Sequence, residues 1–284
     1  MQEVAGKLSC RPFSFPGTWR RATWRRSLSP VIERLGRRTV DAIKAVGGFG
    51  HFVGDLARAV PDVAVWGRLT LVQMRRVGVD SLPVALFIAA FTGVVLALQA
   101  SYTFTGTVPL YFVGTLVGKT MMLELGPVLA GLALAGRVGA SMAAELGTMK
   151  VTEQVDALET LAYDPQSFLV LPRVLAGTTM FPVIVALAIL TGIFTGWIAS
   201  FVLLDLSTQE FLKGLKLFYR FKDTWFGLFK SATFGCTITL VGCVVGLSTR
   251  GGAEGVGRST TRAVVYSAVL LLVLDAFWAL VLLR

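Results

Sequence analysis

The sequence predicts an all-α protein that crosses a membrane several times. Of its 284 residues, 54% are hydrophobic and only 15% are charged, and the mean hydropathy is +0.70. Two stretches, 81–118 and 174–204, contain no charged residue, and each exceeds the roughly 20 residues that span a bilayer core. Because lipid offers no hydrogen-bond partner to the backbone, such stretches must be helical. We expect an N-terminal interfacial amphipathic helix, five transmembrane helices and one polar helix in the cytoplasm.

The first 80 residues are expected to lie outside the membrane core. Residues 1–30 form a basic tail with Glu3 as its one acid and no apolar core of the kind that secretory signals have. We expect this tail to be disordered, although a transit peptide or an early start codon would also explain its composition. Residues 31–80 predict interfacial amphipathic helices, because apolar side chains such as Ile32, Leu35 and Ile43 recur at helical spacing among basic ones. A soluble helix packed on a partner is the alternative.

Residues 81–284 form the predicted membrane domain. Gly106 and Pro109 divide the first apolar stretch into a span at 82–104 and a turn at 105–110, after which a second, long helix continues to about 143. The third span covers 174–204, the fourth runs from near Trp225 to Thr249, and the fifth covers 263–283. A charged segment at 205–224 and a Gly- and Arg-rich loop at 250–262 are expected to connect these spans.

The distribution of basic residues predicts the orientation. Five spans place the first 80 residues, segment 144–173 and segment 250–262 on one side, and these hold nineteen Lys and Arg, against four in 205–224. The side richer in Lys and Arg faces the cytoplasm. The N-terminus is therefore expected to be cytoplasmic, with its charge toward anionic lipid rather than nucleic acid, and Glu124 is expected in the outer half of the membrane.

Charge inside a predicted span is costly and therefore marks candidates for function, and three such residues are singled out. Glu124 is expected to face an internal cavity and to meet a polar group of a substrate or a pairing cation. A bond to Lys119, about one turn away, or to a helix partner is the alternative. Arg137 and Asp275 are expected to be structural charges. Glycines and alanines between 126 and 140 provide a surface for close helix packing, either within a bundle or at a homodimer seam.

Residues 144–160 predict a helix of a different kind. Val151, Val155 and Leu158 form an apolar stripe, while Glu153 and Asp156 lie on another face. A polar amphipathic helix that directly follows a span suggests contact with a soluble protein.

The sequence argues against an enzyme. The one histidine, His51, cannot by itself provide the catalytic residues of a hydrolase. No metal-binding spacing occurs, and the three cysteines do not suggest a disulfide framework. The stretch Val113–Thr120 ends in GKT but lacks the first glycine of a phosphate-binding loop, so we expect no nucleotide site. Transport, a channel or a membrane scaffold remain as function classes.

Three stretches carry a resemblance to a known family. They read ELGPVLAGLALAGRVGASMAAELGTMKVTEQVDALETLAYDP from Glu124, GVDSLPVALFIAAFTGVVLALQ from Gly78, and GVGRSTTRAVV from Gly255. Together they resemble the MlaE/YrbE family of ABC-transporter permeases, and the resemblance covers roughly residues 31–284. The central motif is long and nearly unbroken, which makes it highly specific.

The resemblance implies a subunit of a larger machine. The implied partners are a second copy of the chain, a cytoplasmic ABC ATPase, an MCE-domain protein on the outer side and, in some systems, a STAS-domain subunit. The implied substrate is a phospholipid or a similar hydrophobic lipid, moved between the inner membrane and the outer envelope of a bacterium. ATP and magnesium would bind in the partner ATPase, and no cofactor is expected in this chain.

The resemblance also implies two groups of site residues. A lipid cavity between the two copies would be lined by Leu96, Gln99, Thr103, Phe104, Leu123, Glu124 and Leu125. A coupling helix at about 144–160 would dock on the ATPase through Glu145, Met149, Val151, Glu153, Val155, Asp156 and Leu158. Some relatives have a basic residue where this chain has Leu123, and Lys119 is the nearest substitute. The competing hypothesis is an ion- or proton-coupled carrier that uses Glu124 and Asp275, and a third is a scaffold without transport.

Overall fold

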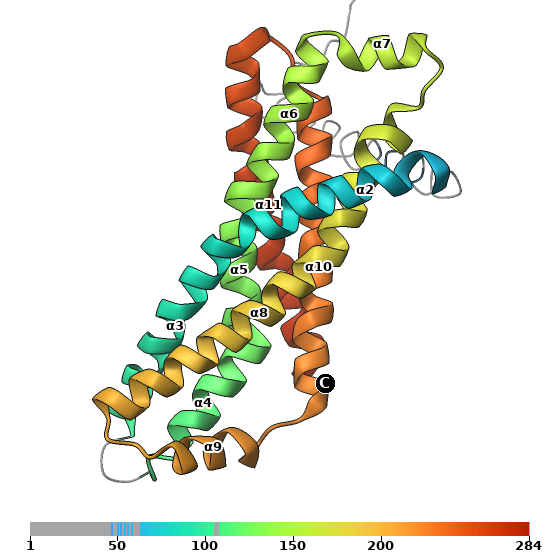
Figure 1. Ribbon diagram of the computed structural model, residues 1–284. Helices are drawn as coiled ribbons and strands as arrows, with labels where there is room; N and C mark the ends of the chain where they lie inside the picture. Colours follow the sequence, from blue (N-terminus) through green and yellow to red (C-terminus); the bar gives the residue numbers. More distant parts are fainter. Residues whose placement is uncertain are drawn as a thin grey trace, which may run out of the picture. The chain divides into compact units, whose positions relative to one another are not determined.

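The computed structural model describes residues 63–104 and 108–283, together with residues 47, 50, 52, 54, 56 and 58. The predicted tail at 1–30, and the amphipathic helix predicted at 31–57 apart from those six positions, lie outside the described residues. The chain divides into two compact units, Met1–Gly48 and Phe49–Arg284. All elements given below belong to the second unit, and within its described residues they are helices without strands (Figure 1).

The five predicted spans are confirmed as helices long and apolar enough to cross a membrane. The helix α2 (Val63–Gly78) precedes the first span and is joined by the short 3₁₀ turn η1 (Val79–Ser81) to α3 (Leu82–Thr103). The second span is one rod of consecutive helical segments: α4 (Phe112–Thr120), η2 (Met121–Leu125), α5 (Gly126–Leu134), η3 (Ala135–Gly139) and α6 (Ala140–Val151). The remaining elements are α7 (Gln154–Thr160), η4 (Gln166–Val170), α8 (Leu171–Leu203), α9 (Thr208–Leu217), α10 (Phe221–Leu247) and α11 (Gly252–Leu283).

Two expectations about local structure are wrong. The segment 250–262 is not a loop, because α11 begins at Gly252 directly after two glycines with positive φ. Glu254 and Arg258 lie one helical turn apart in this segment and form an ion pair of 3.4 Å, which stabilises the helix. The glycines of the segment had favoured a loop. The segment 144–160 is not one helix either: α6 ends at Val151, and Glu153 adopts a left-handed conformation with φ of 60° before α7 begins.

Small residues set the helix crossings. A side chain at Gly93 of α3 would collide with the backbone carbonyl of Gly192 on α8, so these two helices pass at backbone contact. Within the 126–140 stretch, Gly131 faces Leu271 and Phe234 of the same chain, whereas Gly136 has open space around it. Packing inside the bundle therefore explains part of the small-residue surface.

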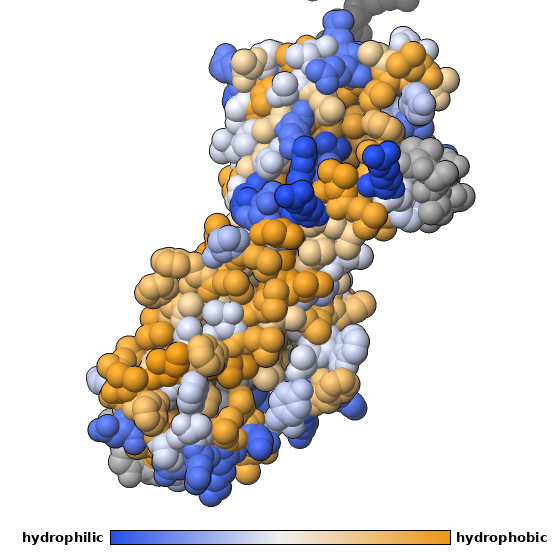
Figure 2. Space-filling view, viewed as in Figure 1, coloured by the Kyte–Doolittle hydropathy of each residue, from blue (hydrophilic) through white to orange (hydrophobic). Residues whose placement is uncertain are grey.

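The surface of this unit changes in polarity along its length. Segments α7 and α9 lie at opposite ends, joined by the long rods (Figure 1). In Figure 2, hydrophobic side chains cover the part built from α3, α4 and α8. Hydrophilic side chains gather at the α9 end and in a band where α2 crosses α6. This band marks the level at which the apolar surface ends.

Candidate functional site

Glu124 lies in a local irregularity of the second span. The residues Met121–Leu125 form a π turn, and Gly126 donates its backbone N–H to the carbonyl of Met121. Pro127 follows and has no N–H, so the usual bond from position 127 to the carbonyl of Leu123 cannot form. The Leu123 carbonyl instead accepts a hydrogen bond of 3.4 Å from Lys230. The Glu-Leu-Gly-Pro sequence thus opens the helix where the carboxylate stands, and such π turns are frequent at functional sites.

Lys230 joins two acids inside the membrane domain. Its side chain is fully buried on α10, and its Nζ lies 2.7 Å from Glu124 Oε2 and 2.5 Å from Asp275 Oδ1. We call these three residues the buried charge cluster. The alternative in which a helix partner satisfies Glu124 therefore holds, whereas the alternative that named Lys119 is wrong, since Lys119 pairs with Asp223 at 3.3 Å. Asp275 has the ion pair expected of a structural charge.

The buried charge cluster is open on one side. The Glu124 side chain is 43% exposed and that of Asp275 is 17% exposed, although Lys230 is shielded completely. One ammonium faces two carboxylates, so the cluster is an electronegative spot in an otherwise apolar wall. Such a spot can hold a cationic or hydrogen-bond-donating group that approaches along the exposed face of Glu124.

The residues assigned to the lipid cavity fall into two sets. Leu96, Phe104 and Leu125 pack into one apolar cluster between α3, the second span and α8. Gln99 and Thr103 are exposed on α3, and Leu123 is half-buried beside Glu124. In this single chain the first set is therefore part of the packed interior, and the second set lies at or near the surface. A separate apolar cavity of about 660 Å³ lies between α8 and α9, where Phe194, Trp197 and Phe211 help to line it.

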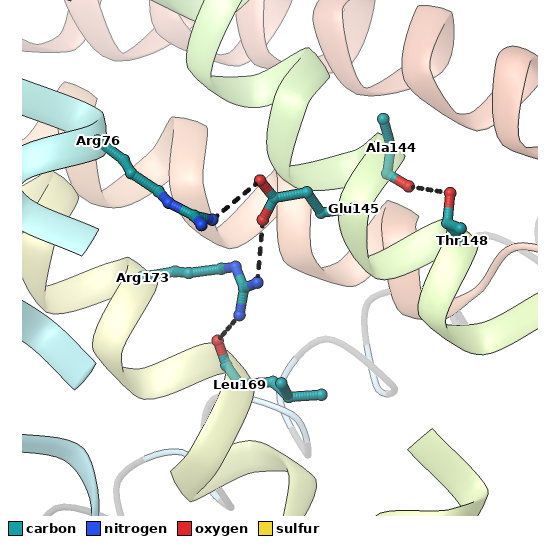
Figure 3. Close-up of polar contacts among 6 residues, drawn as sticks. All are labelled: Arg76, Ala144, Glu145, Thr148, Leu169 and Arg173. Atoms are coloured by element: carbon teal, nitrogen blue, oxygen red, sulfur yellow. Dashed lines mark hydrogen bonds and ion pairs between the residues drawn. The ribbon is translucent and has the colours of Figure 1, made fainter. Parts of the chain in front are cut away.

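Glu145 forms a partly exposed bridge to two arginines of the same chain. Its carboxylate accepts hydrogen bonds from Arg76 at 3.3 Å and from Arg173 at 3.1 Å, which ties α6 to α2 and α8 (Figure 3). Arg173 is buried and also donates to the Leu169 carbonyl at 2.6 Å. Glu145 therefore has two partners within the chain, although it was predicted from the sequence to contact an ATPase.

The remaining coupling residues separate into an inner and an outer face. Val155 is buried, and Met149 and Leu158 pack against the same core. Val155 and Leu158 anchor α7 to the bundle, while Met149 lies on α6 and Val151 is half-buried at the end of that helix. Glu153 and Asp156 are exposed, and Asp156 accepts a hydrogen bond of 2.6 Å from Lys150. The acidic side chains at α7 are thus open to a partner, and Val155 is not.

Sequence reasoning missed three residues of interest. Lys230 falls inside the fourth span, which was expected to begin near Trp225, but it was not singled out as a charge in the membrane. Leu161 and Tyr163, which follow α7, have exposed fractions of 67% and 51%. Two large apolar side chains beside an exposed acidic face are typical of a protein contact, and their place just after a polar helix was the available signal.

Arg137, which was expected to be a structural charge, differs from Asp275 in its surroundings. It lies in the π turn η3 and is exposed, and within the described residues it forms no ion pair. Those residues also contain no group of three or more His, Cys, Asp or Glu side chains that could hold a metal ion. Cys236 and Cys243 are free thiols.

Comparison with known proteins identifies the family. The family model described as Permease MlaE matches residues 70–281. A probable ABC transporter permease protein of Rickettsia felis is 38% identical over 243 residues, covering 86% of this chain and 94% of the relative. A probable ABC transporter permease of Synechocystis is 41% identical over 210 residues, covering 74% and 80%. The intermembrane phospholipid transport system permease protein MlaE of Haemophilus influenzae is 31% identical over 245 residues, covering 86% and 94%. The chain, a multi-pass all-α membrane protein, belongs to the MlaE permease family of ABC transporters.

Proposed function

We propose that this permease moves phospholipid, or a lipid of similar character, between a bacterial inner membrane and the outer envelope, driven by a separate ABC ATPase. The N-terminus would face the cytoplasm, as the excess of Lys and Arg on that side suggests. The name of the Haemophilus influenzae relative supports phospholipid as the substrate class. ATP and magnesium would belong to the ATPase. A second copy of the chain and an MCE-domain protein, with a STAS-domain subunit in some systems, would complete the machine.

The surface at α7 is the observation that carries the proposal. An exposed acidic face with Glu153 and Asp156 lies beside the exposed Leu161 and Tyr163, and Val155 fixes this surface to the bundle from the inside. A permease that is driven by a soluble motor needs such a rigid projection, because a flexible one would absorb the motion of the partner. We assign contact with the ATPase to this outer face, and anchoring to Val155, Leu158 and Met149.

The exposed face around Glu124 suits a lipid. Glu124 offers a partly exposed carboxylate beside the half-buried Leu123, and Gln99 and Thr103 are exposed polar residues on α3. In a dimer, two such faces would enclose a cavity with apolar walls for acyl chains and a polar spot for the headgroup. Closure of the ATPase would draw the two copies together and squeeze the lipid toward or from the outer partner.

The test is charge reversal on the outer face of α7. In a complex reconstituted with its ATPase in liposomes, Glu153→Arg with Asp156→Arg should abolish lipid-stimulated ATP hydrolysis, because two attractive contacts become repulsive. Glu254→Arg, at an exposed acid on α11, is the control and should keep the stimulation. Full stimulation in the double variant would refute the docking surface.

The ion-coupled carrier remains the competing function, since the buried charge cluster places two carboxylates in the membrane domain. Lys230 already engages both Glu124 and Asp275, so a transported ion would have to displace a buried ammonium. Vanadate separates the two hypotheses, because it traps ABC ATPases. Transport that continues in vanadate and follows an ion gradient would favour the carrier.

A further inference from the structure

A polar pocket lies beside Arg137, which is 13 residues after Glu124 on the same helical rod and therefore about 20 Å from it. Its volume is about 270 Å³, and α2, η1, η3 and α6 contribute to its wall. The polar side chains that line it are those of Gln73, Arg76, Asp80, Ser81, Arg137, Ser141 and Glu145. Glu145 is the residue that binds Arg76 and Arg173 in Figure 3. The pocket belongs to the hydrophilic band at which the apolar surface ends (Figure 2).

Two polar groups in this pocket lack partners. Arg137 forms no ion pair within the part of the chain that the structure describes. Ser81 is only 1% exposed, yet its hydroxyl has no hydrogen-bond partner, and it makes no capping bond although it precedes the first residue of α3. A buried hydroxyl without a partner costs about 1–3 kcal/mol. A guanidinium and an unsatisfied hydroxyl in one cavity are suited to a phosphate group.

The pocket also contains the opposite charge. Arg76 is held by Glu145, which leaves Arg137 as the cation and Asp80 as the anion that can receive a ligand. These two lie on different walls and do not form an ion pair with each other. We propose that this pocket binds the headgroup of a zwitterionic phospholipid, with the phosphate at Arg137 and Ser81 and the amine at Asp80.

The surroundings favour a lipid over free phosphate. Exposed apolar side chains also occur next to the pocket residues Asp80 and Ser81 in the chain: Val79 in η1 and Val84 in the first turn of α3, with exposed fractions of 55% and 41%. Acyl chains of a lipid could lie against them while the headgroup enters the pocket. A volume of 270 Å³ equals roughly nine water molecules, which is room for a phosphate and an ethanolamine but not for two acyl chains. The site would receive lipid at the cytoplasmic boundary, apart from the Glu124 face.

The experiment counts lipids bound to the purified full chain in detergent by native mass spectrometry during a titration with phosphatidylethanolamine. Titrations are repeated in Glu124→Gln, so that lipid on the other face is not counted. Arg137→Gln should weaken binding about tenfold, since it removes a charge-assisted bond, and Arg137→Lys should retain most of it. Arg75→Gln is the matched control, because Arg75 is exposed on α2 outside the pocket.

Further arms test each half of the assignment. Asp80→Asn should weaken phosphatidylethanolamine but leave phosphatidylglycerol unchanged, and equal effects on both would overturn the amine contact. Displacement of the lipid by inorganic phosphate would overturn the lipid in favour of a free anion. Ser81→Ala removes a single hydroxyl and should weaken binding about threefold, so it gives the answer if Arg137→Gln fails to fold. Unchanged binding in a folded Arg137→Gln or in Ser81→Ala would refute the site.

Discussion

Replacement of Lys230 by methionine tests the buried charge cluster most directly. Methionine keeps much of the volume of lysine but removes the ammonium that lies 2.7 Å from Glu124 and 2.5 Å from Asp275. Breaking a buried ion pair by removing one partner costs about 3–5 kcal/mol, because the other charge stays without compensation. Glu124 is 43% exposed and keeps some hydration, so we expect the lower end, about 3 kcal/mol. This corresponds to a roughly 150-fold change in the unfolding equilibrium.

The assay is thermal unfolding of the purified chain in detergent, followed by the loss of the monodisperse peak in size-exclusion chromatography. Lys150→Met is the matched control, because both side chains of its pair with Asp156 are partly exposed, at 34% and 53%, so the cost should stay below about 1 kcal/mol. Adding Glu124→Gln and Asp275→Asn to Lys230→Met should restore most of the stability, since no charge is then unpaired. A Lys230→Met chain as stable as the parent would refute the reasoning.

Three further changes test the packing, the turn and the bridge, each by the same thermal assay. Gly93→Ala should destabilise the chain by about 1–3 kcal/mol, since its Cβ would meet the backbone of α8, whereas Gly136→Ala, in open space, should be neutral or stabilising; equal effects would contradict the crossing. Glu153→Gly should stabilise by up to about 1 kcal/mol, because glycine tolerates a φ of 60°, and a loss of stability would count against the left-handed turn. Glu145→Gln should cost about 1–3 kcal/mol, as Arg173 is buried, and no loss would mean that the bridge is unimportant.

Much of the fold could be predicted from composition along the chain. Uncharged stretches such as 81–118 and 174–204 specify spanning helices by themselves, because every backbone group in lipid must be paired within its own helix. The spacing of Val155 and Leu158 also predicted an apolar face on α7. The start of α11 at Gly252 and the break at Glu153 could not be predicted in this way. Glycines and polar residues are compatible with both loop and helix, and contacts elsewhere decide between them.

The sequence by itself determined which residues are costly in a membrane, and therefore that Glu124 and Asp275 need partners. Only the tertiary structure decided that Lys230 is the partner of both acids, although it lies 106 positions after Glu124 in the chain. It likewise decided that Glu145 meets Arg76 and Arg173, and that Arg137 meets no acid among the described residues. The physical reason is that hydropathy is a property of each segment alone, whereas an ion pair forms where two helices cross, and small residues such as Gly93 set that crossing.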